Sequence, residues 1–284
     1  MVVRELLSIS AKQLKEADIA QPVLDARLII EHTLGQGELF VVKNPFFDVS
    51  ELDVAIILEK IKMRANHMPL SYMTNSREFM SLPFYVDENV LIPRPDSECL
   101  VENVLELLKT RPIKKRFILD IGTGSGALAI SAAYYDSDVS ADGIDISSEA
   151  VEIAKKNAEQ NGVLTRCNFF ICDILKDSPP KKYDFILSNP PYIKPEVIET
   201  LEADVRDYEP MGALCGGEDG LLFYREITKK AYDMLTEDGM IAFEIGYDQK
   251  EDVMGLLRNE GFTDVVCLED LAGNPRVVTA KRTC

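Results

Sequence analysis

The sequence has little of what several large classes of protein depend on. Its only histidines are His32 and His67, both far upstream of the motifs described below. A His-based catalytic triad or a His-rich metal site is therefore not expected, and we predict no bound metal. The chain has no apolar run of about 18 residues, and its start, Met1 to Glu5, is mixed and charged, unlike a secretory signal peptide. We expect a cytoplasmic protein without a membrane span.

Paired cysteines are also missing. No C-x-x-C pair occurs in the sequence, which disfavours a zinc site and a disulfide framework. We predict reduced thiols for all six cysteines, which are Cys99, Cys167, Cys172, Cys215, Cys267 and Cys284.

Positive charge is scarce. The chain has 31 Lys and Arg against 48 Asp and Glu, a net charge of −17. Proteins that bind nucleic acid usually present a basic face to the phosphates. The one basic cluster, residues 109–116, is predicted to be solvent-exposed charge at a helix end and in the loop after it. The charge therefore favours a small-molecule or protein substrate, and we expect no direct contact with nucleic acid.

The first part of the chain is predicted to be all-helical. Apolar residues recur at helical spacing from Val3 to Leu14, from Pro22 towards Gly35, and from Leu52 to Ile61, where Ser50 is a candidate N-cap. No catalytic motif occurs in this part. We predict a small helical domain over residues 1–75 that recognises the substrate.

A β-hairpin linker is predicted over residues 76–94, with a catalytic domain over residues 95–284. The predicted strands of the hairpin are Arg77–Met80 and Phe84–Val86, separated by Ser81-Leu82-Pro83. Pro95 is predicted to open the helix that follows the linker.

Strands and helices alternate from Phe117 onward. Strands are predicted over residues 117–119, 139–144, 168–171, 183–187, 240–245, 265–268 and 277–280. This alternation is typical of a Rossmann-like α/β fold, a doubly wound and mostly parallel sheet, here of seven strands, with helices on both faces. Ligands of such sheets bind outside the carboxyl ends of the strands.

The stretch Asn189-Pro190-Pro191-Tyr192 follows a predicted buried strand. Each proline excludes the α region for the residue before it and has no N–H to donate. The loop is therefore stiff and extended, with few local donors for its carbonyl groups. Asn189 adds a side-chain carbonyl, and Tyr192 adds an aromatic face. We infer a rigid set of acceptors for a planar NH2 group, either an amide or an exocyclic base amine.

A second motif, Gly122-Thr123-Gly124-Ser125-Gly126, lies between a predicted strand and helix. Its glycines allow close approach of the backbone to a ligand. Asp145 ends the next strand, 23 residues after Gly122, where a carboxylate can accept hydrogen bonds from ribose hydroxyls. With Ala127 in the third position, the spacing also fits the dinucleotide fingerprint. The loop alone therefore leaves NAD-type and S-adenosylmethionine-type binding open.

Asp173 closes the third predicted strand and is followed by Ile174. At the same edge of the sheet, Asp173 can contact an adenine amine while Ile174 packs against the ring. The glycine loop, Asp145, Asp173 and the Asn189 stretch come from four successive strand ends, so we expect one crevice to collect all four.

The order of these motifs resembles that of S-adenosylmethionine-dependent amino methyltransferases. Further stretches are similar to the HemK/PrmC family, and the resemblance covers about Arg77 to Val278. Asp96-Ser97 stands where many members have Glu-Thr, which keeps the acid and the hydroxyl. The stretches are Arg77–Phe84, Leu91–Glu98, Gly216–Leu221 and Asp270–Val277.

Members of that family methylate the side-chain amide nitrogen of the glutamine in the Gly-Gly-Gln motif of class I peptide chain release factors. The resemblance implies S-adenosylmethionine as the methyl donor and S-adenosylhomocysteine as the product. It implies that Gly122 to Gly126 wrap the methionine part of the cofactor, that Asp145 binds the ribose, and that Asp173 with Ile174 binds the adenine.

The resemblance also implies roles around the substrate amide. Oδ1 of Asn189 and the carbonyl of Pro190 would accept its two N–H bonds, and Tyr192 would pack on the glutamine side chain. Asn189, Pro190 and Tyr192 are thus the candidate catalytic residues. Pro191 completes the substrate-binding set, and Asn189 also borders the cofactor.

Other substrates and functions stay open at this point. A ribosomal-protein glutamine needs the same chemistry. An exocyclic amine of DNA or RNA also suits the Asn189 stretch, although the net charge disfavours it. A non-enzymatic cofactor-binding assembly factor is disfavoured because Asn189 and Tyr192 are retained. We predict class I release factors as the partner and a monomeric enzyme.

Overall fold

The computed structural model describes residues 1–110 and 115–283. Residues 111–114 of the basic cluster and Cys284 lie outside the described residues. The chain forms two compact units, of which the smaller comprises Met1–Ser76 and Glu202–Tyr208, and the larger comprises Arg77–Leu201 and Glu209–Cys284. The single boundary predicted near residue 75 does not account for the second piece of the smaller unit.

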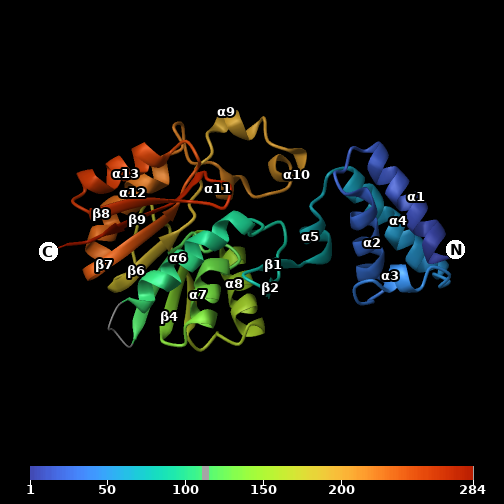
Figure 1. The fold of residues 1–284 in the computed structure, drawn as a ribbon, viewed down its shortest axis with the longest axis horizontal. Coiled ribbons are helices and arrows are strands. Elements are labelled where there is room, and N and C mark those ends of the chain that lie inside the picture. Colours follow the sequence, from blue (N-terminus) through green and yellow to red (C-terminus); the bar gives the residue numbers. More distant parts are fainter. Residues whose placement is uncertain (111–114, 284) are drawn as a thin grey trace. The chain divides into compact units, whose positions relative to one another are not determined.

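The smaller unit is helical (Figure 1). The three predicted helical segments are confirmed as α1 (Val3–Glu16), α2 (Pro22–Thr33) and α4 (Glu51–Ala65). Ser50 caps α4, because its hydroxyl accepts a hydrogen bond from the Asp53 N–H at 3.1 Å. Three short helices were not predicted, namely α3 (Phe40–Lys43), α5 (Leu70–Thr74) and α10 (Ala203–Arg206).

One apolar core holds the smaller unit together. The fully buried side chains of Leu6, Ile29 and Ile57 come from α1, α2 and α4, whose apolar faces therefore meet. The piece that returns late in the sequence is hydrogen-bonded into this unit, since the Tyr208 hydroxyl donates to the Asn66 carbonyl at 2.8 Å.

The β-hairpin lies in the larger unit, and its turn differs from the predicted one. Its strands are β1 (Arg77–Phe79) and β2 (Leu82–Phe84), with Phe79 opposite Leu82. The turn is Met80–Ser81, and both residues have positive φ. A two-residue hairpin turn of this hand matches the twist of the strands, and it usually carries Asn or Gly. Because the two turn residues are neither Asn nor Gly, the sequence did not mark them as a turn. The prediction therefore placed the turn at Ser81-Leu82-Pro83.

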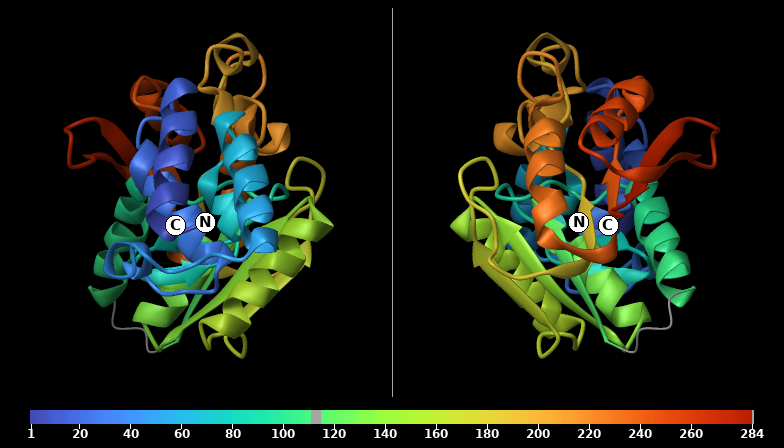
Figure 2. Two further views of the ribbon diagram at one scale, coloured as in Figure 1. Left: turned by 90° about the vertical axis from the view of Figure 1, so that its right-hand side faces the viewer. Right: turned by 90° about the vertical axis from the view of Figure 1, so that its left-hand side faces the viewer.

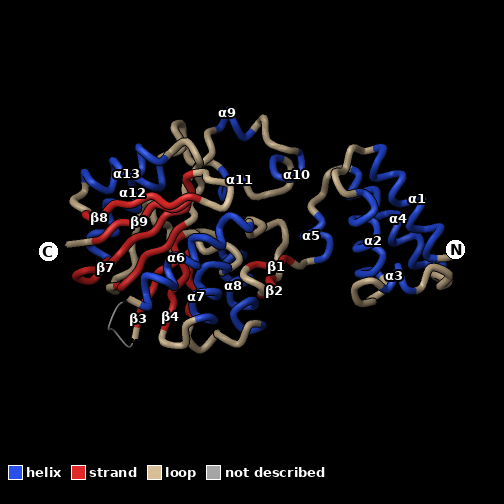
Figure 3. The backbone as a smooth tube through the Cα atoms, viewed as in Figure 1, coloured by secondary structure: helices blue, strands red, loops and turns tan. Residues whose placement is uncertain are grey.

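A seven-stranded sheet forms the centre of the larger unit (Figure 3). The strand order is β5-β4-β3-β6-β7-β9-β8, in which the first five strands are parallel and β9 runs antiparallel to both of its neighbours. The predicted fold class is confirmed. The strands are β3 (Arg116–Ile121), β4 (Val139–Asp145), β5 (Cys167–Ile171), β6 (Tyr183–Ser188), β7 (Leu235–Glu244), β8 (Thr263–Glu269) and β9 (Pro275–Lys281).

Helices cover both faces of this sheet, as Figures 1 and 2 show. One apolar core joins the sheet to α6, α7 and α8, and the other joins it to α12 and α13. In β3, the buried Ile118 faces the first core and Leu119 the second, so the middle of the strand is apolar on both faces. The helices are α6 (Glu98–Lys109), α7 (Ala127–Tyr135), α8 (Ser148–Gln160), α12 (Leu222–Met234) and α13 (Lys250–Asn259), and short ones are α9 (Pro195–Ile198) and α11 (Met211–Leu214).

Strand β7 begins five residues earlier than the predicted Met240, at Leu235. Its first part pairs Leu235 with Tyr183, and the ladder resumes at Phe185 and Met240 after an irregularity. The residues between Leu235 and Met240 are polar, so the apolar pattern did not predict this extension of the strand. A turn of 3-10 helix, η1 (Pro95–Ser97), precedes α6, where Pro95 was predicted to open an α-helix.

None of the described helices is long and apolar enough to cross a membrane. The five cysteines within the described residues are free thiols, as predicted for them.

Candidate functional site

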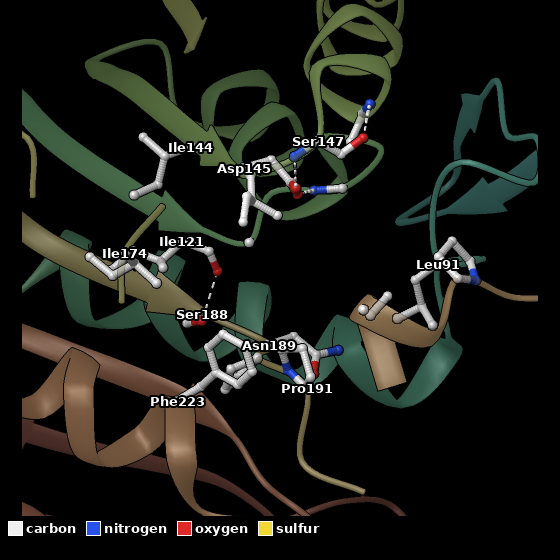
Figure 4. A pocket seen from close by; sticks show the side chains of 18 of the residues that line it. Leu91, Ile121, Ile144, Asp145, Ser147, Ile174, Ser188, Asn189, Pro191 and Phe223 are labelled. Carbon is white, nitrogen blue, oxygen red and sulfur yellow. Dashed lines mark hydrogen bonds between the residues drawn. The ribbon is translucent and has the colours of Figure 1, made fainter. Parts of the chain in front are cut away.

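The carboxyl ends of four neighbouring parallel strands border one cavity of about 330 Å³ (Figure 4). The glycine loop follows β3, Asp145 ends β4, Asp173 follows β5, and Asn189 follows β6. The sheet order β5-β4-β3-β6 makes these four ends adjacent. Residues Gly122, Gly124, Asp145, Asp173, Ile174, Asn189, Pro190 and Pro191 all line the cavity.

Two glycines of the loop face open space. Gly122 and Gly124 have φ of +74° and +53°, and an added Cβ at either position would meet nothing within 4 Å. Gly126 has a different reason to be glycine, because an added Cβ would lie 2.7 Å from the Ile130 side chain and 3.1 Å from that of Ala154. Gly126 therefore serves the packing of α7 on α8, and it does not line the cavity.

Thr123 and Ser125 line a smaller pocket beside the main cavity, which they share with Asn189 and Arg94. Most of the loop's N–H groups already have acceptors within the protein. Those of Gly122 and Thr123 donate to the Ile144 carbonyl, and that of Gly126 donates to the Thr123 carbonyl. The loop thus offers a ligand its open backbone surface more than its amide protons.

Asp145 is held by two backbone donors. One carboxylate oxygen accepts from the Gly124 N–H at 2.9 Å and the other from the Ser147 N–H at 3.0 Å (Figure 4). An ionised carboxylate has about four lone-pair sites, so Asp145 keeps acceptor capacity toward the cavity. Ser147 also caps α8, because its hydroxyl accepts a hydrogen bond from the Ala150 N–H at 3.1 Å.

Asp173 lies two residues beyond β5 and does not close the strand as predicted. One of its carboxylate oxygens accepts from the Leu175 N–H at 3.1 Å, and the other pairs with the Lys176 ammonium at 2.8 Å. The hydrogen bond from Lys176 lowers the pKa of Asp173. Ile174 is buried and forms an apolar wall with Ile121 and Phe223 (Figure 4).

Sequence reasoning gave no role to Asp120, whose side chain is hydrogen-bonded to the glycine loop. It is fully buried, and Oδ2 accepts from the Thr123 hydroxyl at 2.7 Å and from the Ala129 N–H at 3.3 Å. Burial raises the pKa of this carboxyl to about 7, against the effect of the Thr123 hydrogen bond. An acidic residue at the end of a buried strand was the available signal.

The side chain of Asn189 has a fixed partner. Its Nδ2 donates to the Ser97 hydroxyl at 3.2 Å. The preceding residue, Ser188, donates from its hydroxyl to the Ile121 carbonyl at 2.7 Å and ties the strand end to β3 (Figure 4). One N–H of the Asn189 amide is used inside the protein, whereas its Oδ1 accepts no hydrogen bond from the described residues and is available to a ligand.

Tyr192 does not line the cavity. It packs against the core beneath α12, and burial raises its pKa to about 12. An added Cβ at Gly216 would lie 2.6 Å from the Tyr192 Cα, and one at Gly220 would lie 2.5 Å from its carbonyl oxygen. The glycines of the stretch Gly216–Leu221 are therefore needed for close packing on this loop.

Gln249 is a second residue that sequence reasoning missed. Its Nε2 donates to the carbonyls of Tyr192 and Gly220, both at 3.2 Å, and its Oε1 accepts from the Gly246 N–H at 3.0 Å. The buried amide thus fixes the end of the Asn189 stretch.

Glu244 is a third such residue, and it ends β7 with only 2% of its surface exposed. Burial raises the pKa of its carboxyl to about 7, although the neighbouring Ser97 and Asn189 side chains act in the opposite direction. A glutamate inside the apolar run Ile241–Ile245 was the signal in the sequence. Among the described residues, no group of three or more His, Cys, Asp or Glu side chains is arranged to hold a metal ion.

Comparison with known proteins agrees with this geometry. The PrmC N-terminal domain matches residues 5–74, and the methyltransferase small domain matches residues 96–204. A release factor glutamine methyltransferase from Clostridium botulinum is 40% identical over 99% of this chain and 100% of its own length. One from Agrobacterium fabrum is 37% identical over 99% and 97%. The chain belongs to the release factor glutamine methyltransferase family.

Membership of this family extends the resemblance, which the motifs carried over about Arg77 to Val278, to the smaller unit. Solved structures show the fold. The hMettl16 catalytic domain superposes with a TM-score of 0.59 at 18% identity, over 79% of this chain and 82% of that one. A methyltransferase from Pyrococcus furiosus gives a TM-score of 0.54 at 18% identity, over 78% and 99%. The larger unit thus has a methyltransferase fold.

Proposed function

We propose that this protein methylates the side-chain amide nitrogen of the glutamine in the Gly-Gly-Gln motif of class I release factors, with S-adenosylmethionine as donor. The observation that carries the proposal is the state of Asn189. One N–H of its amide is held by Ser97 and the residue lines the cavity, so Oδ1 is available there as an acceptor. A glutamine amide has two N–H donors to offer such an acceptor and the neighbouring carbonyl of Pro190.

The residues of the cavity fit the donor. Its volume of about 330 Å³ is within the range of small-molecule sites. Asp145, with lone pairs to spare, suits the ribose hydroxyls, and the wall formed by Ile121, Ile174 and Phe223 suits an adenine ring. The open surface at Gly122 and Gly124 suits the methionine part. For Asp173 we keep the contact with the adenine amine as part of the proposal.

The reaction requires little of the protein beyond the orientation of the substrate amide toward the methyl group. S-adenosylmethionine supplies a methyl group whose bond to sulfur breaks as its bond to the amide nitrogen forms, after which the nitrogen releases a proton. An amide nitrogen is a weak nucleophile because its lone pair is delocalised. Asn189 and Pro190 would hold the NH2 group in line, and their carbonyl dipoles favour the positive charge that develops on it. Pro191 and Tyr192 would keep the loop rigid. Because Tyr192 packs against the core and does not line the cavity, a contact of its ring with the glutamine side chain would have to lie outside the cavity.

We assign recognition of the release factor to the smaller unit. It carries no part of the cavity, and several large apolar side chains of α3 and the loop after it are exposed. Val42 is 62% exposed and Phe46 70% exposed. Where exposed apolar side chains gather in one patch they are typical of protein-binding surfaces, and these lie within a few residues of one another in the sequence.

The test is methyl transfer from labelled S-adenosylmethionine to purified release factors, ribosomal proteins and nucleic acids in parallel. We expect label in class I release factors, at the Gly-Gly-Gln glutamine when the peptide is sequenced by mass spectrometry. Asn189→Ala should lower the single-turnover rate about 100- to 1,000-fold, with little change in cofactor affinity. Label confined to ribosomal protein or nucleic acid would refute the proposed substrate.

Two controls accompany this experiment. Asn168→Ala removes an exposed asparagine on the edge strand β5 and should leave the rate unchanged. Calorimetry should detect binding of S-adenosylmethionine and S-adenosylhomocysteine but not of NAD. Binding of NAD alone would overturn the cofactor assignment.

A further inference from the structure

The carboxyl group of Glu244 is buried directly behind Asn189. Strand β7 lies beside β6 in the sheet, and Ser188 is paired with Phe243 in the register. Glu244 and Asn189 are therefore the next residues along two adjacent strand ends. Ser97 and Asn189 act to lower the pKa of Glu244, against the effect of burial, so both side chains lie close to its carboxyl group. The two strand ends are thus linked through a buried acid that lines neither pocket.

Asn189 and Ser97 together connect the acid to the site. The amide of Asn189 has two N–H donors, of which one reaches the Ser97 hydroxyl and the other is available to Glu244. The Ser97 hydroxyl, which accepts from Asn189, has its own proton to give to Glu244. With its two N–H donors directed at Ser97 and Glu244, the Asn189 amide would turn Oδ1 toward the cavity.

The negative charge of Glu244 has no cation of its own among the described residues. The cation that acts on its pKa is Arg276 on β9, which pairs with Asp96 and Asp270, both at 3.2 Å. Oε2 of Glu244 has no hydrogen-bond partner in the described part of the chain. A buried acid left in this state costs stability, so its presence needs a reason other than the fold.

We propose that Glu244 is a positioning residue, whose carboxylate fixes the Asn189 amide so that Oδ1 meets the substrate, and whose charge strengthens that acceptor during methyl transfer. The inference rests on the proposed function, in which positive charge develops on the substrate amide nitrogen. A carboxylate that accepts from the Asn189 N–H polarises the amide and makes Oδ1 more negative. The charge would thus be used in the transition state.

This role makes the rate depend on pH. Only the ionised carboxylate acts, and the pKa of Glu244 is raised to about 7, so the rate should fall as the pH drops through this value. The groups that face Glu244 from the surrounding elements are Arg276 on β9, Asp96 on η1, Cys99 on α6, Tyr192 on the loop, and Tyr224 on α12. The pKa values of Cys99 and Tyr192 are raised to about 11 and about 12, and burial raises the pKa of Tyr224 well above its ordinary value. The thiol and the two phenols therefore stay neutral near pH 7.

The experiment compares Glu244→Gln, Glu244→Leu and the wild type in single turnovers with saturating S-adenosylmethionine and a class I release factor. Glutamine keeps an acceptor but no charge, so we expect a rate about tenfold lower and no dependence on pH near 7. Leucine removes the acceptor as well, and a misplaced Asn189 should lower the rate about 100-fold. The KM for the release factor should stay within about twofold in both variants.

Asp184→Asn is the matched control. It makes the same acid-to-amide change in a buried side chain of β6, at the end of the strand away from the site, where Asp184 accepts from the Phe117 N–H. It should leave the pH dependence of the rate as in the wild type. A wild-type rate and pH profile in Glu244→Gln would overturn the proposal, and so would a loss confined to folding, seen as reduced cofactor binding and thermal stability.

A second measurement needs no substrate. In protein labelled with nitrogen-15 at asparagine, the side-chain NH2 signals of Asn189, assigned by their absence in Asn189→Ala, should shift with pH around 7 in the wild type and not in Glu244→Gln. If the wild type fails to methylate release factors while these signals titrate, the substrate assignment is wrong and the Glu244–Asn189 coupling stands. Signals that do not titrate in the wild type would overturn the coupling itself.

Discussion

Two buried carboxyl groups, those of Asp120 and Glu244, lie behind the two loops that form the site. Each is buried at the end of a strand, and burial raises the pKa of each to about 7. Each also retains one oxygen without a hydrogen-bond partner among the described residues. At the scale of single residues, the site is therefore built on acids that the fold itself would be more stable without.

This state of Asp120 should be visible in the stability of the protein. Its pKa in the folded protein is above the ordinary value of 3.8, so between about pH 4 and pH 7 the folded state holds a proton that the unfolded chain has released. Stability contributed by this proton is lost as the pH rises through that range. Asp120→Asn should reduce this loss by up to about 1 kcal/mol per pH unit.

Urea unfolding at several pH values measures this slope. Glu244→Gln should reduce the loss over a similar range, because the pKa of Glu244 is also raised to about 7. The double variant should have the flattest profile. An identical slope in the wild type and in Asp120→Asn would show that Asp120 is ionised in the folded protein.

At the scale of elements, the two kinds of glycine in the loop have separable roles. Gly126→Ala should destabilise the protein by about 1–3 kcal/mol, because its Cβ would overlap Ile130 and Ala154 between α7 and α8. Gly124→Ala meets open space and should cost only about 1 kcal/mol for its positive φ. Its methyl group would extend into the cavity, so it should weaken S-adenosylmethionine binding more than Gly126→Ala does.

Unfolding and calorimetry on the two variants distinguish these effects. The predicted pattern is a large loss of stability with modest loss of affinity for Gly126→Ala, and the reverse for Gly124→Ala. Equal effects of both variants on both quantities would mean that the loop acts as a unit.

The elements also show what the sequence could and could not predict. The strands of the sheet and the helices α1, α2 and α4 follow from apolar runs and caps, which are local signals. The hairpin turn was missed because Met80 and Ser81 adopt positive φ without glycine. The cavity was predictable because parallel strands bring their ends together. Ser97 was not, because its contact with Asn189 spans 92 residues.

At the scale of the whole molecule, recognition and chemistry are assigned to different units. Phe46→Ser on the smaller unit should raise the KM for an intact release factor about tenfold, because an exposed apolar contact would be lost. Cofactor affinity should not change. Leu164→Ser is the control, since Leu164 is an exposed apolar residue before β5, away from the cavity. An unchanged KM in Phe46→Ser, measured by steady-state methylation, would remove this surface from recognition.

The return of Glu202–Tyr208 to the helical unit has a consequence for biosynthesis. When Ala65 ends α4, the last helix of the predicted bundle, the segment that carries Tyr208 has not yet been translated. The first four strands of the sheet, β3 to β6, are made before it. A nascent chain therefore cannot finish its first unit before most of the second has left the ribosome, and the two units reach their final form late and close together in time.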